Sequence, residues 1–287
     1  MAIQTLPYME KRKLQVAVMS DLHLGTYGCQ AKSIIHYLRS IETEILVLNG
    51  DIIDMWQFSK HYFPESHMQV IREIFGHLSK GTKVYYITGN HDDRLRSYTD
   101  LEMGQFVLTD KLVLDMDGRK AWIFHGDVFD ATTQGSAKII AKLGGAGYSL
   151  LILINQAINW TLALFGKEKM SFSKKIKNAV KKAVIWIQNF EDTAAHLAIE
   201  KGYDFVICGH IHQPTIKKVY TIKGEVTYLN SGDWVENCTA LEYNNKEWSI
   251  HTHNATRNTD IVYDEGLKIK IPDVASDVIS HLLQPAS

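Results

Sequence analysis

Short apolar runs recur along the chain, and each one leads into a small cluster of polar residues. Five of these runs are rich in β-branched or aromatic residues: 14–19, 45–48, 84–87, 121–124 and 205–208. Most are followed by glycine, as buried strands often are. Segments with helical spacing, such as 31–41 and 66–78, lie between them. This alternation of strands and helices predicts an α/β fold.

The C-terminal third changes its pattern. Segments 224–230, 239–243 and 248–253 have the character of strands without helices between them, and Asn244-Asn245 is a hairpin turn signal. We therefore expect a second, more antiparallel sheet from these strands. Beyond about residue 254 the pattern weakens, and we expect part of that tail to be disordered.

A long helical insertion, about 131–200, separates the fourth and fifth apolar runs. Its first half contains an apolar stretch, 148–165, which Asn155, Gln156 and Asn159 interrupt on one side. That spacing predicts an amphipathic helix rather than a transmembrane span. The second half, 173–190, is helical in pattern, and lysines gather around it: Lys167, Lys169, Lys174, Lys175, Lys177, Lys181 and Lys182. Basic charge beside an apolar helix is typical of a segment that contacts a membrane surface.

Composition limits the classes of protein to consider. The chain has 287 residues, 45% of them apolar and 22% charged, with a net charge of -1. These values predict a soluble globular protein, which we interpret as a single domain over 1–287, and they give no global basic field for nucleic acid. The three cysteines are scattered and the first residues lack an apolar signal core. A reduced, cytoplasmic chain is therefore expected.

The polar clusters themselves carry the chemistry. They read Asp21-Leu22-His23, Gly50-Asp51-Ile52-Ile53-Asp54, Gly89-Asn90-His91-Asp92, His125-Gly126-Asp127 and Gly209-His210-Ile211-His212. Each follows an apolar run, so the side chains are expected just past the carboxyl ends of the strands, where ligands bind in open α/β sheets. Together they supply enough carboxylate, amide and imidazole groups for two neighbouring divalent cations. A site of that kind hydrolyses phosphate esters and anhydrides.

Asp51 is the natural carboxylate to bridge the two cations, because Gly50 allows a sharp turn before it. We expect Asp21, His23 and His212 to complete one metal site, and Asn90, His125 and His210 to complete the other. Mixed nitrogen and oxygen ligands suit Mn²⁺, Fe²⁺ or Zn²⁺ better than Mg²⁺, and we take Mn²⁺ as the first choice. Any one of these residues alone is as well explained as a turn residue or a core polar group.

Residues beside Asn90 are candidates for contact with the substrate. A protonated His91 next to Asn90 is placed to protonate the leaving oxygen, with its ring held by Asp92 or Asp54. The alternative is that His91 merely neighbours the site. Asn90, Arg94 and Arg96 are candidate phosphate-binding groups, since arginines form forked contacts with phosphate oxygens; a solvated helical pair is the other interpretation of the arginines. His251-Thr252-His253 imitates the fifth motif but lacks its glycine, so we exclude it.

The order of the five motifs resembles that of the calcineurin-like metallophosphoesterase superfamily, D-x-H, G-D-x-x-D, G-N-H-[DE], H-G-D and G-H-x-H, over about residues 16–234. The resemblance implies a four-layer α/β/β/α sandwich with a two-metal centre. Within the superfamily the chain is most similar to the UDP-2,3-diacylglucosamine pyrophosphohydrolases of lipid A synthesis. Asp21-Leu22-His23-Leu24-Gly25, Gly232-Asp233-Trp234 and the position of the helical insertion carry that similarity.

The resemblance implies a cap, about 131–200, that holds the acyl chains of a lipid-linked nucleotide. From the lysine cluster we expect this segment also to rest on the cytoplasmic face of the membrane; the alternative is a helix pair packed onto the core of the sandwich. His91 is a departure, because an arginine follows the motif asparagine in the best-known members of that family. The expected activity is metal-dependent cleavage of a phosphoanhydride in a nucleotide-linked lipid. The rivals are a phosphodiesterase or phosphomonoesterase with a soluble substrate, a non-catalytic scaffold, which the complete ligand set argues against, and a nuclease.

Overall fold

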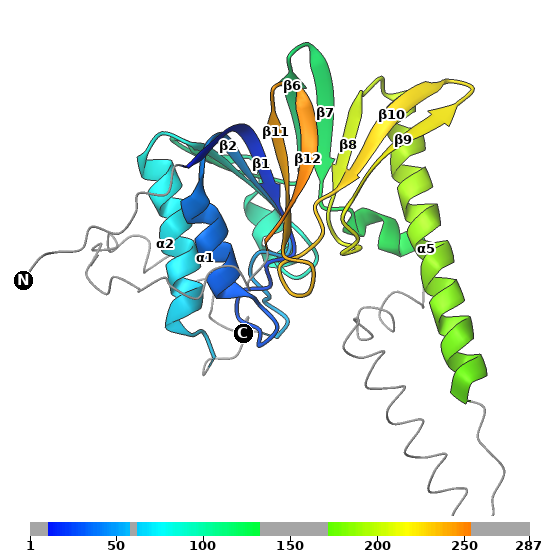
Figure 1. The fold of residues 1–287 in the computed structure, drawn as a ribbon, viewed down its shortest axis with the longest axis horizontal. Coiled ribbons are helices and arrows are strands. Elements are labelled where there is room, and N and C mark those ends of the chain that lie inside the picture. Colours follow the sequence, from blue (N-terminus) through cyan, green and yellow to red (C-terminus); the bar gives the residue numbers. More distant parts are fainter. Residues whose placement is uncertain (1–10, 58–61, 133–171, 254–287) are drawn as a thin grey trace, which may run out of the picture. The chain divides into compact units, whose positions relative to one another are not determined.

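Two β-sheets form the centre of the protein. The computed structural model describes residues 11–57, 62–132 and 172–253, which fall within one compact unit. Among these residues a seven-stranded sheet has the order β12-β11-β1-β2-β3-β5-β4, and a five-stranded sheet has the order β6-β7-β8-β10-β9. Figure 1 shows α1 and α2 beside the first sheet and α5 along the second.

The elements have the following bounds: β1 Arg12–Met19, α1 Ala31–Ser40, β2 Ile41–Asn49, α2 Glu65–Ser79, β3 Lys83–Ile87, a 3-10 helix Asp93–Tyr98, β4 Leu101–Met103, β5 Phe106–Thr109, β6 Lys111–Met116, β7 Arg119–Phe124, a 3-10 helix Asp127–Thr132, α5 Phe172–Glu200, β8 Phe205–Cys208, β9 Thr215–Thr221, β10 Gly224–Asn230, β11 Thr239–Asn244 and β12 Glu247–Thr252.

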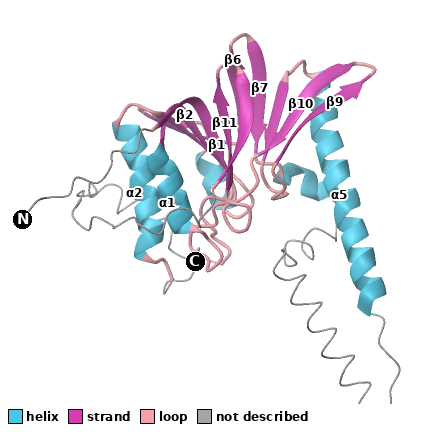
Figure 2. Ribbon diagram, viewed as in Figure 1, coloured by secondary structure: helices cyan, strands magenta, loops and turns pink. Residues whose placement is uncertain are grey.

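Strand β1 is buried on both faces, which explains its unbroken apolar sequence. Val16 and Val18 pack into the core between the sheets, together with Ile123 and Ile207 of the second sheet. Because side chains alternate along a strand, the equally buried Ala17 and its neighbours face the other way. Helices α1 and α2 pack against each other and against β2 and β3, and Figure 2 shows both on one side of the first sheet.

Helix α5 covers the outer face of the second sheet. Its residues Ala194, Ala195 and Ala198 are buried against Val206 and Tyr228 of that sheet. Alanines let the helix approach the strands closely. The layers are therefore helix, sheet, sheet and helix, and the predicted α/β/β/α sandwich is confirmed. The last third of the range 131–200, predicted as a cap, thus supplies one layer of the sandwich.

The prediction that the last strands form a sheet of their own is wrong. β10 pairs parallel with β8 in the five-stranded sheet, whereas β11 crosses to the first sheet and pairs antiparallel with β1. The crossing places Leu241 and Tyr243 of β11 in the core between the sheets. The hairpin turn is confirmed: Asn245 and Lys246 both have positive φ, 50° and 66°, as the tight turn between antiparallel strands requires.

Some predictions concern residues that lie outside the described ranges. They include the apolar stretch 148–165 and the tail from residue 254. Within the described part of the chain, no helix is long and apolar enough to cross a membrane. The helix predicted over 173–190 is present and extends to Glu200 as α5.

Candidate metal centre

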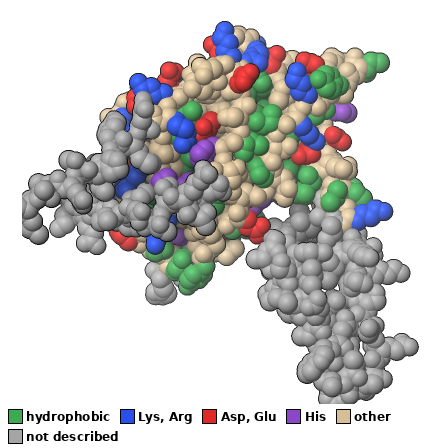
Figure 3. Space-filling view, in the orientation of Figure 1, with side chains coloured by type: hydrophobic (Ala, Val, Ile, Leu, Met, Phe, Trp, Pro, Cys, Tyr) green, Lys and Arg blue, Asp and Glu red, His purple; other side chains and the backbone are tan. Residues whose placement is uncertain are grey.

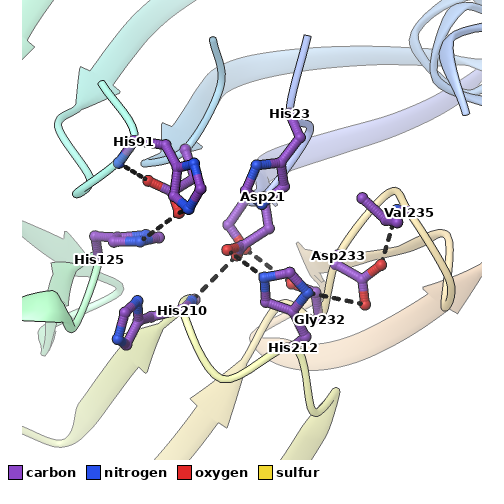
Figure 4. A network of polar contacts seen from close by, with 12 residues as sticks. Asp21, His23, His91, His125, His210, His212, Gly232, Asp233 and Val235 are labelled. Atoms are coloured by element: carbon purple, nitrogen blue, oxygen red, sulfur yellow. Dashed lines mark hydrogen bonds and ion pairs between the residues drawn. The ribbon is translucent and has the colours of Figure 1, made fainter. Parts of the chain in front are cut away.

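All five motifs meet at one end of the two sheets. Asp21 follows β1, Asp51 follows β2, His125 follows β7 and His210 follows β8, while Asn90 lies just past β3. These strands run parallel to their partners within each sheet, so their carboxyl ends share an edge. Figure 4 shows the side chains of the first, fourth and fifth motifs converging from separate strand ends.

Main-chain hydrogen bonds hold the first two motif loops in register beyond their strands. The N–H of Asp21 donates to the Gly50 carbonyl at 3.0 Å, and the N–H of His23 donates to the Asp51 carbonyl at 3.0 Å. These bonds continue the parallel pairing of β1 with β2. They place the Asp21 and Asp51 side chains at equivalent positions on neighbouring loops.

The backbone is left-handed at the motif residues. The φ angles of Asp21, His23, Asp51, His210 and His212 are 54°, 50°, 54°, 67° and 53°. Residues with a Cβ rarely adopt this conformation, and such backbone strain clusters at functional sites.

Two motif glycines are explained by close approach. A Cβ at Gly89 would lie 2.3 Å from Asp51 Oδ1, and one at Gly209 would lie 2.7 Å from Asp21 Oδ2. Both contacts are far shorter than van der Waals contact permits. Glycine at these two positions is therefore a condition for packing the carboxylates into the site.

Three overlapping groups of side chains have ligand atoms within 4.8 Å of one another: Asp21 with His23 and His212; His23 with Asp51 and His91; and Asp51 with His125 and His210. The first and third groups agree with the two predicted metal sites, and Asp51 belongs to two of the groups. The second group adds His91 to the cluster. Six of the seven predicted ligands are thus brought together through these groups, and Asn90 is the seventh.

The buried polar atoms of this cluster fit a metal centre. His23 Nε2 and Asn90 Oδ1 are buried without a hydrogen-bond partner among the described residues. Each such atom costs about 1–3 kcal/mol in a protein interior. His125 Nδ1 lies 2.9 Å from the Asn49 carbonyl, which requires Nδ1 to carry a proton. The Nε2 atom, 3.3 Å from Asp51 Oδ2, is therefore the ring atom left to bind a cation.

The electrostatics also favour cations. Although burial opposes ionisation, the neighbouring His212 lowers the pKa of Asp21 to about 2. Burial likewise opposes a charge on His212, but Asp21, 3.0 Å away, raises the pKa of His212 to about 9. Against the effect of burial, Asp51 raises the pKa of His125 well above its usual value. Asp21 is thus kept ionised in a buried place, paired with an imidazole, and its charge attracts positive partners.

His91 lies between a carboxylate and an aromatic ring. Its Nδ1 is 2.9 Å from Asp54 Oδ2, and the Trp56 ring covers it at a centroid distance of 4.2 Å. Burial lowers the pKa of His91, but Asp54 and Asp51 outweigh it and the pKa is raised. The surroundings of the ring thus favour its protonated form. Asp54, not Asp92, holds it, and Asp54 also contacts His23 Nδ1 at 3.2 Å.

Asp92 fastens the loops together and does not face the cluster. Its Oδ2 accepts hydrogen bonds from the N–H of Ile52 at 2.9 Å and from the Tyr86 hydroxyl at 2.6 Å. Its Oδ1 accepts from the N–H of Gly89 at 2.5 Å. Both oxygens are therefore occupied, and the predicted catalytic role of Asp92 is replaced by a structural one.

The two arginines predicted to bind phosphate differ in their surroundings. Arg96 donates to Asp127 Oδ2 at 2.6 Å and to Thr88 Oγ1 at 3.3 Å. Its guanidinium thus ties the third motif to the fourth, and its contact with phosphate stays a prediction. Arg94 is exposed on the 3-10 helix Asp93–Tyr98, and its role stays a prediction.

Sequence reasoning missed two supports of the site. Trp56, which covers His91, lies two residues after the second motif, so an aromatic residue at that place was a usable signal. The Asn49 carbonyl that orients His125 is a main-chain group, and no residue type marks it. The excluded pair, His251 and His253, lies elsewhere, against Tyr37 and His36.

Comparison with known proteins agrees with this geometry. The family model described as calcineurin-like phosphoesterase matches residues 14–214. UDP-2,3-diacylglucosamine hydrolase of Aliivibrio fischeri is 26% identical over 247 residues, covering 83% of this chain and 98% of the relative. The proteins of the same name from Blochmanniella pennsylvanica and Neisseria meningitidis are 24% and 27% identical, covering 88% and 75% of this chain and 96% and 88% of the relatives. The chain belongs to the calcineurin-like phosphoesterase family and is a hydrolase of phosphoester or phosphoanhydride bonds that uses divalent metal ions.

Proposed function

We propose that this enzyme cleaves the pyrophosphate of a UDP-linked, diacylated glucosamine. The observation that carries the proposal is the similarity to UDP-2,3-diacylglucosamine hydrolases over nearly their full length, 98% and 96% of the first two relatives. The convergence of the motif side chains at one sheet edge supports a phosphohydrolase of this kind.

The metal ligands in this proposal are the seven predicted from the sequence, six of which occur in the three groups of neighbouring side chains. Asp21, His23 and His212 would hold one cation, Asn90, His125 and His210 would hold the other, and Asp51 would be shared by both. The mixed nitrogen and oxygen donors favour Mn²⁺, with Fe²⁺ or Zn²⁺ as alternatives. When bound, two such cations activate a water molecule and neutralise the phosphoryl oxygens.

The residues of the chain orient the substrate and move the proton. His91 donates a proton to the leaving oxygen, a role that needs a protonated imidazole at the site. The Asp54 carboxylate, 2.9 Å from Nδ1, forms an ion pair with the ring, whose Nε2 lies 4.0 Å from Asp51 Oδ2. The Trp56 ring excludes water from one face of His91. Arg94, exposed nearby in sequence, is kept as a candidate for phosphate contact.

The predicted membrane contact belongs to the same proposal. A lipid-linked nucleotide resides in a bilayer, so the enzyme is proposed to act in the cytoplasm at the inner face of the cytoplasmic membrane. The segment about 131–200 acts as the cap that holds acyl chains and contacts anionic lipid. The Lys-rich part of α5 supports that contact, since each basic residue near an anionic surface contributes about 1 kcal/mol.

The decisive experiment compares two substrates with Mn²⁺-loaded protein. A UDP-linked diacyl sugar should be cleaved with a far higher kcat/KM than a generic aryl phosphodiester, and the products should be UMP and the sugar phosphate. Equal rates, or cleavage of the aryl ester alone, would contradict the lipid substrate while preserving the hydrolase.

A soluble phosphodiester or phosphomonoester is the second candidate. His91 favours it, because an imidazole acid serves many phosphate esters, whereas the best-known lipid enzymes are expected to have arginine there. A nuclease receives less support. On the face drawn in Figure 3, basic and acidic side chains are interspersed, and the net charge of the chain is -1.

A further inference from the structure

Helix α5 contacts the candidate metal centre through two aromatic side chains. Trp186 and Phe190 lie one turn apart, and their ring centroids are 6.1 Å and 6.2 Å from that of His210. They continue the stripe that, at Ala194 and Ala198, packs on the second sheet. Large rings thus replace alanine where the helix reaches the ends of the strands.

The His210 ring has three ring neighbours. The His125 ring meets it edge-on, with centroids 5.2 Å apart, and the rings of Trp186 and Phe190 on α5 add two further contacts. The main chain of His210 is held separately, because its N–H donates to Asp21 Oδ2 at 3.1 Å. The ring contacts therefore bear on the direction of the imidazole.

Phe190 is itself firmly seated. It is 3% exposed, and Phe129 meets its ring edge-on at 5.5 Å. Gly126 leaves the space that the ring fills, since a Cβ there would lie 2.5 Å from Phe190 Cζ. The glycine of the fourth motif thus admits an aromatic side chain of α5 beside the cluster.

We propose that Trp186 and Phe190 are positioning residues that fix the His210 imidazole in the direction its metal requires. The inference rests on the proposed function only in taking His210 as a ligand. It makes α5, which forms the last part of the predicted cap segment, a mechanical link to the metal pair. Val184 and Ile185, which precede Trp186 on α5, are 47% and 45% exposed.

The test measures Mn²⁺ binding by the full-length protein, without substrate. Trp186→Leu and Phe190→Leu should each weaken the binding of one of the two Mn²⁺ ions by about 10–100-fold, the usual effect of removing a group that orients a ligand. Trp186→Phe should restore most of the affinity. Trp122→Leu is the matched control, because Trp122 packs on the same apolar cluster through Phe124 and Tyr203. It should lower the melting temperature of the metal-free protein while keeping both ions.

Each outcome decides the matter. The inference would be overturned if both α5 variants kept the wild-type Mn²⁺ affinity, or if Trp122→Leu lost as much affinity as they do. This holds even if His210→Ala loses one ion, because that result tests only the assignment of His210 as a ligand. If the wild-type chain binds fewer than two Mn²⁺, or His210→Ala keeps both, the ligand assignment fails and the inference fails with it. The inference is supported if the loss of Mn²⁺ affinity is confined to the two α5 variants and their circular dichroism spectra are those of folded protein.

Discussion

The main-chain N–H of His91 donates to Asp51 Oδ1 at 2.8 Å. Asp51 therefore has one oxygen committed to the third motif, and its Oδ2 lies 3.3 Å from His125 Nε2 in the fourth. A single carboxylate thus joins loops from both sheets. Its loss affects the arrangement of the site as well as any ion it binds.

Asp51→Ala is expected to abolish hydrolysis and to remove most of the bound metal, because the bridging charge is lost. Metal content is measured by elemental analysis, and turnover is measured with an aryl phosphodiester as substrate. Alanine also adds strain at a φ of 54°, so Asp117→Ala, at a φ of 56° outside the site, is the matched control. Full metal occupancy with normal turnover in Asp51→Ala would sink the assignment.

His91→Ala should lower kcat by about 10²–10⁴-fold, the usual contribution of general acid catalysis, while the metal content stays near that of the wild type. The loss should be confined to substrates with poor leaving groups, since a nitrophenolate departs without a proton. Rates on a nitrophenyl ester and on an alkyl ester provide the comparison. An unchanged rate on the alkyl ester would rule out the acid role.

The two arginines of the third motif loop should respond differently. Arg96→Ala leaves Asp127, 8% exposed in its side chain, without its ion pair, and should lower the free energy of unfolding by about 1–3 kcal/mol. Arg94→Ala should leave stability unchanged and, if Arg94 binds phosphate, raise KM. Urea unfolding and steady-state kinetics of the two variants check this contrast. Equal stability of both variants would contradict the structural role of Arg96.

Acid should destabilise the protein through the histidines beside α1. Burial, then His36, His251 and Arg12, lowers the pKa of His253 from 6.5 to about 4. Glu242 is the acidic group facing this cluster, near His251. With the folded pKa below the unfolded one, the unfolded chain binds more protons between these values. The melting temperature should therefore fall as the pH drops from about 6.5 to about 4, and His253→Asn should reduce that fall. An identical pH profile in the variant would exclude His253.

The membrane proposal makes a prediction of its own. Changing Lys174, Lys175, Lys181 and Lys182 to Glu should weaken cosedimentation with acidic liposomes, because electrostatic attraction to the lipid is reversed. The same four-charge reversal at Lys13, Lys80, Lys201 and Lys218, all exposed, serves as the control. Binding that ignores the first set, or responds equally to both, would argue for a substrate in solution.

Much of the fold could be predicted because its strands are buried on both faces and therefore unbroken in sequence. Thr215–Thr221 was missed because β9 is an edge strand, exposed at every second residue. The sheet chosen by β11 was misassigned for another reason. The alternating apolar and polar residues of β11 are compatible with either sheet. Its pairing with β1 in the folded protein decides which sheet it joins.

The candidate site likewise could be predicted from the sequence only in part. The ligand types and their order were readable from the motifs, because each ligand follows a strand end. The choice between Asp54 and Asp92 as partner of His91 was not readable, since both carboxylates lie close to His91 in the folded chain. Only the loop geometry, which turns Asp92 toward the N–H groups of Ile52 and Gly89, separates them.

The left-handed turns at the motifs have an evolutionary consequence. Five residues in a conformation that costs about 1–2 kcal/mol each amount to a sizeable share of the 5–15 kcal/mol typical of a domain. Glycine would relieve that strain at His23, His210 or His212, where φ is 50°, 67° and 53°. A population selected only for heat resistance should accumulate glycine or asparagine at these positions and become more stable but inactive. The histidines at positions 23, 210 and 212 therefore persist only under selection for the reaction itself.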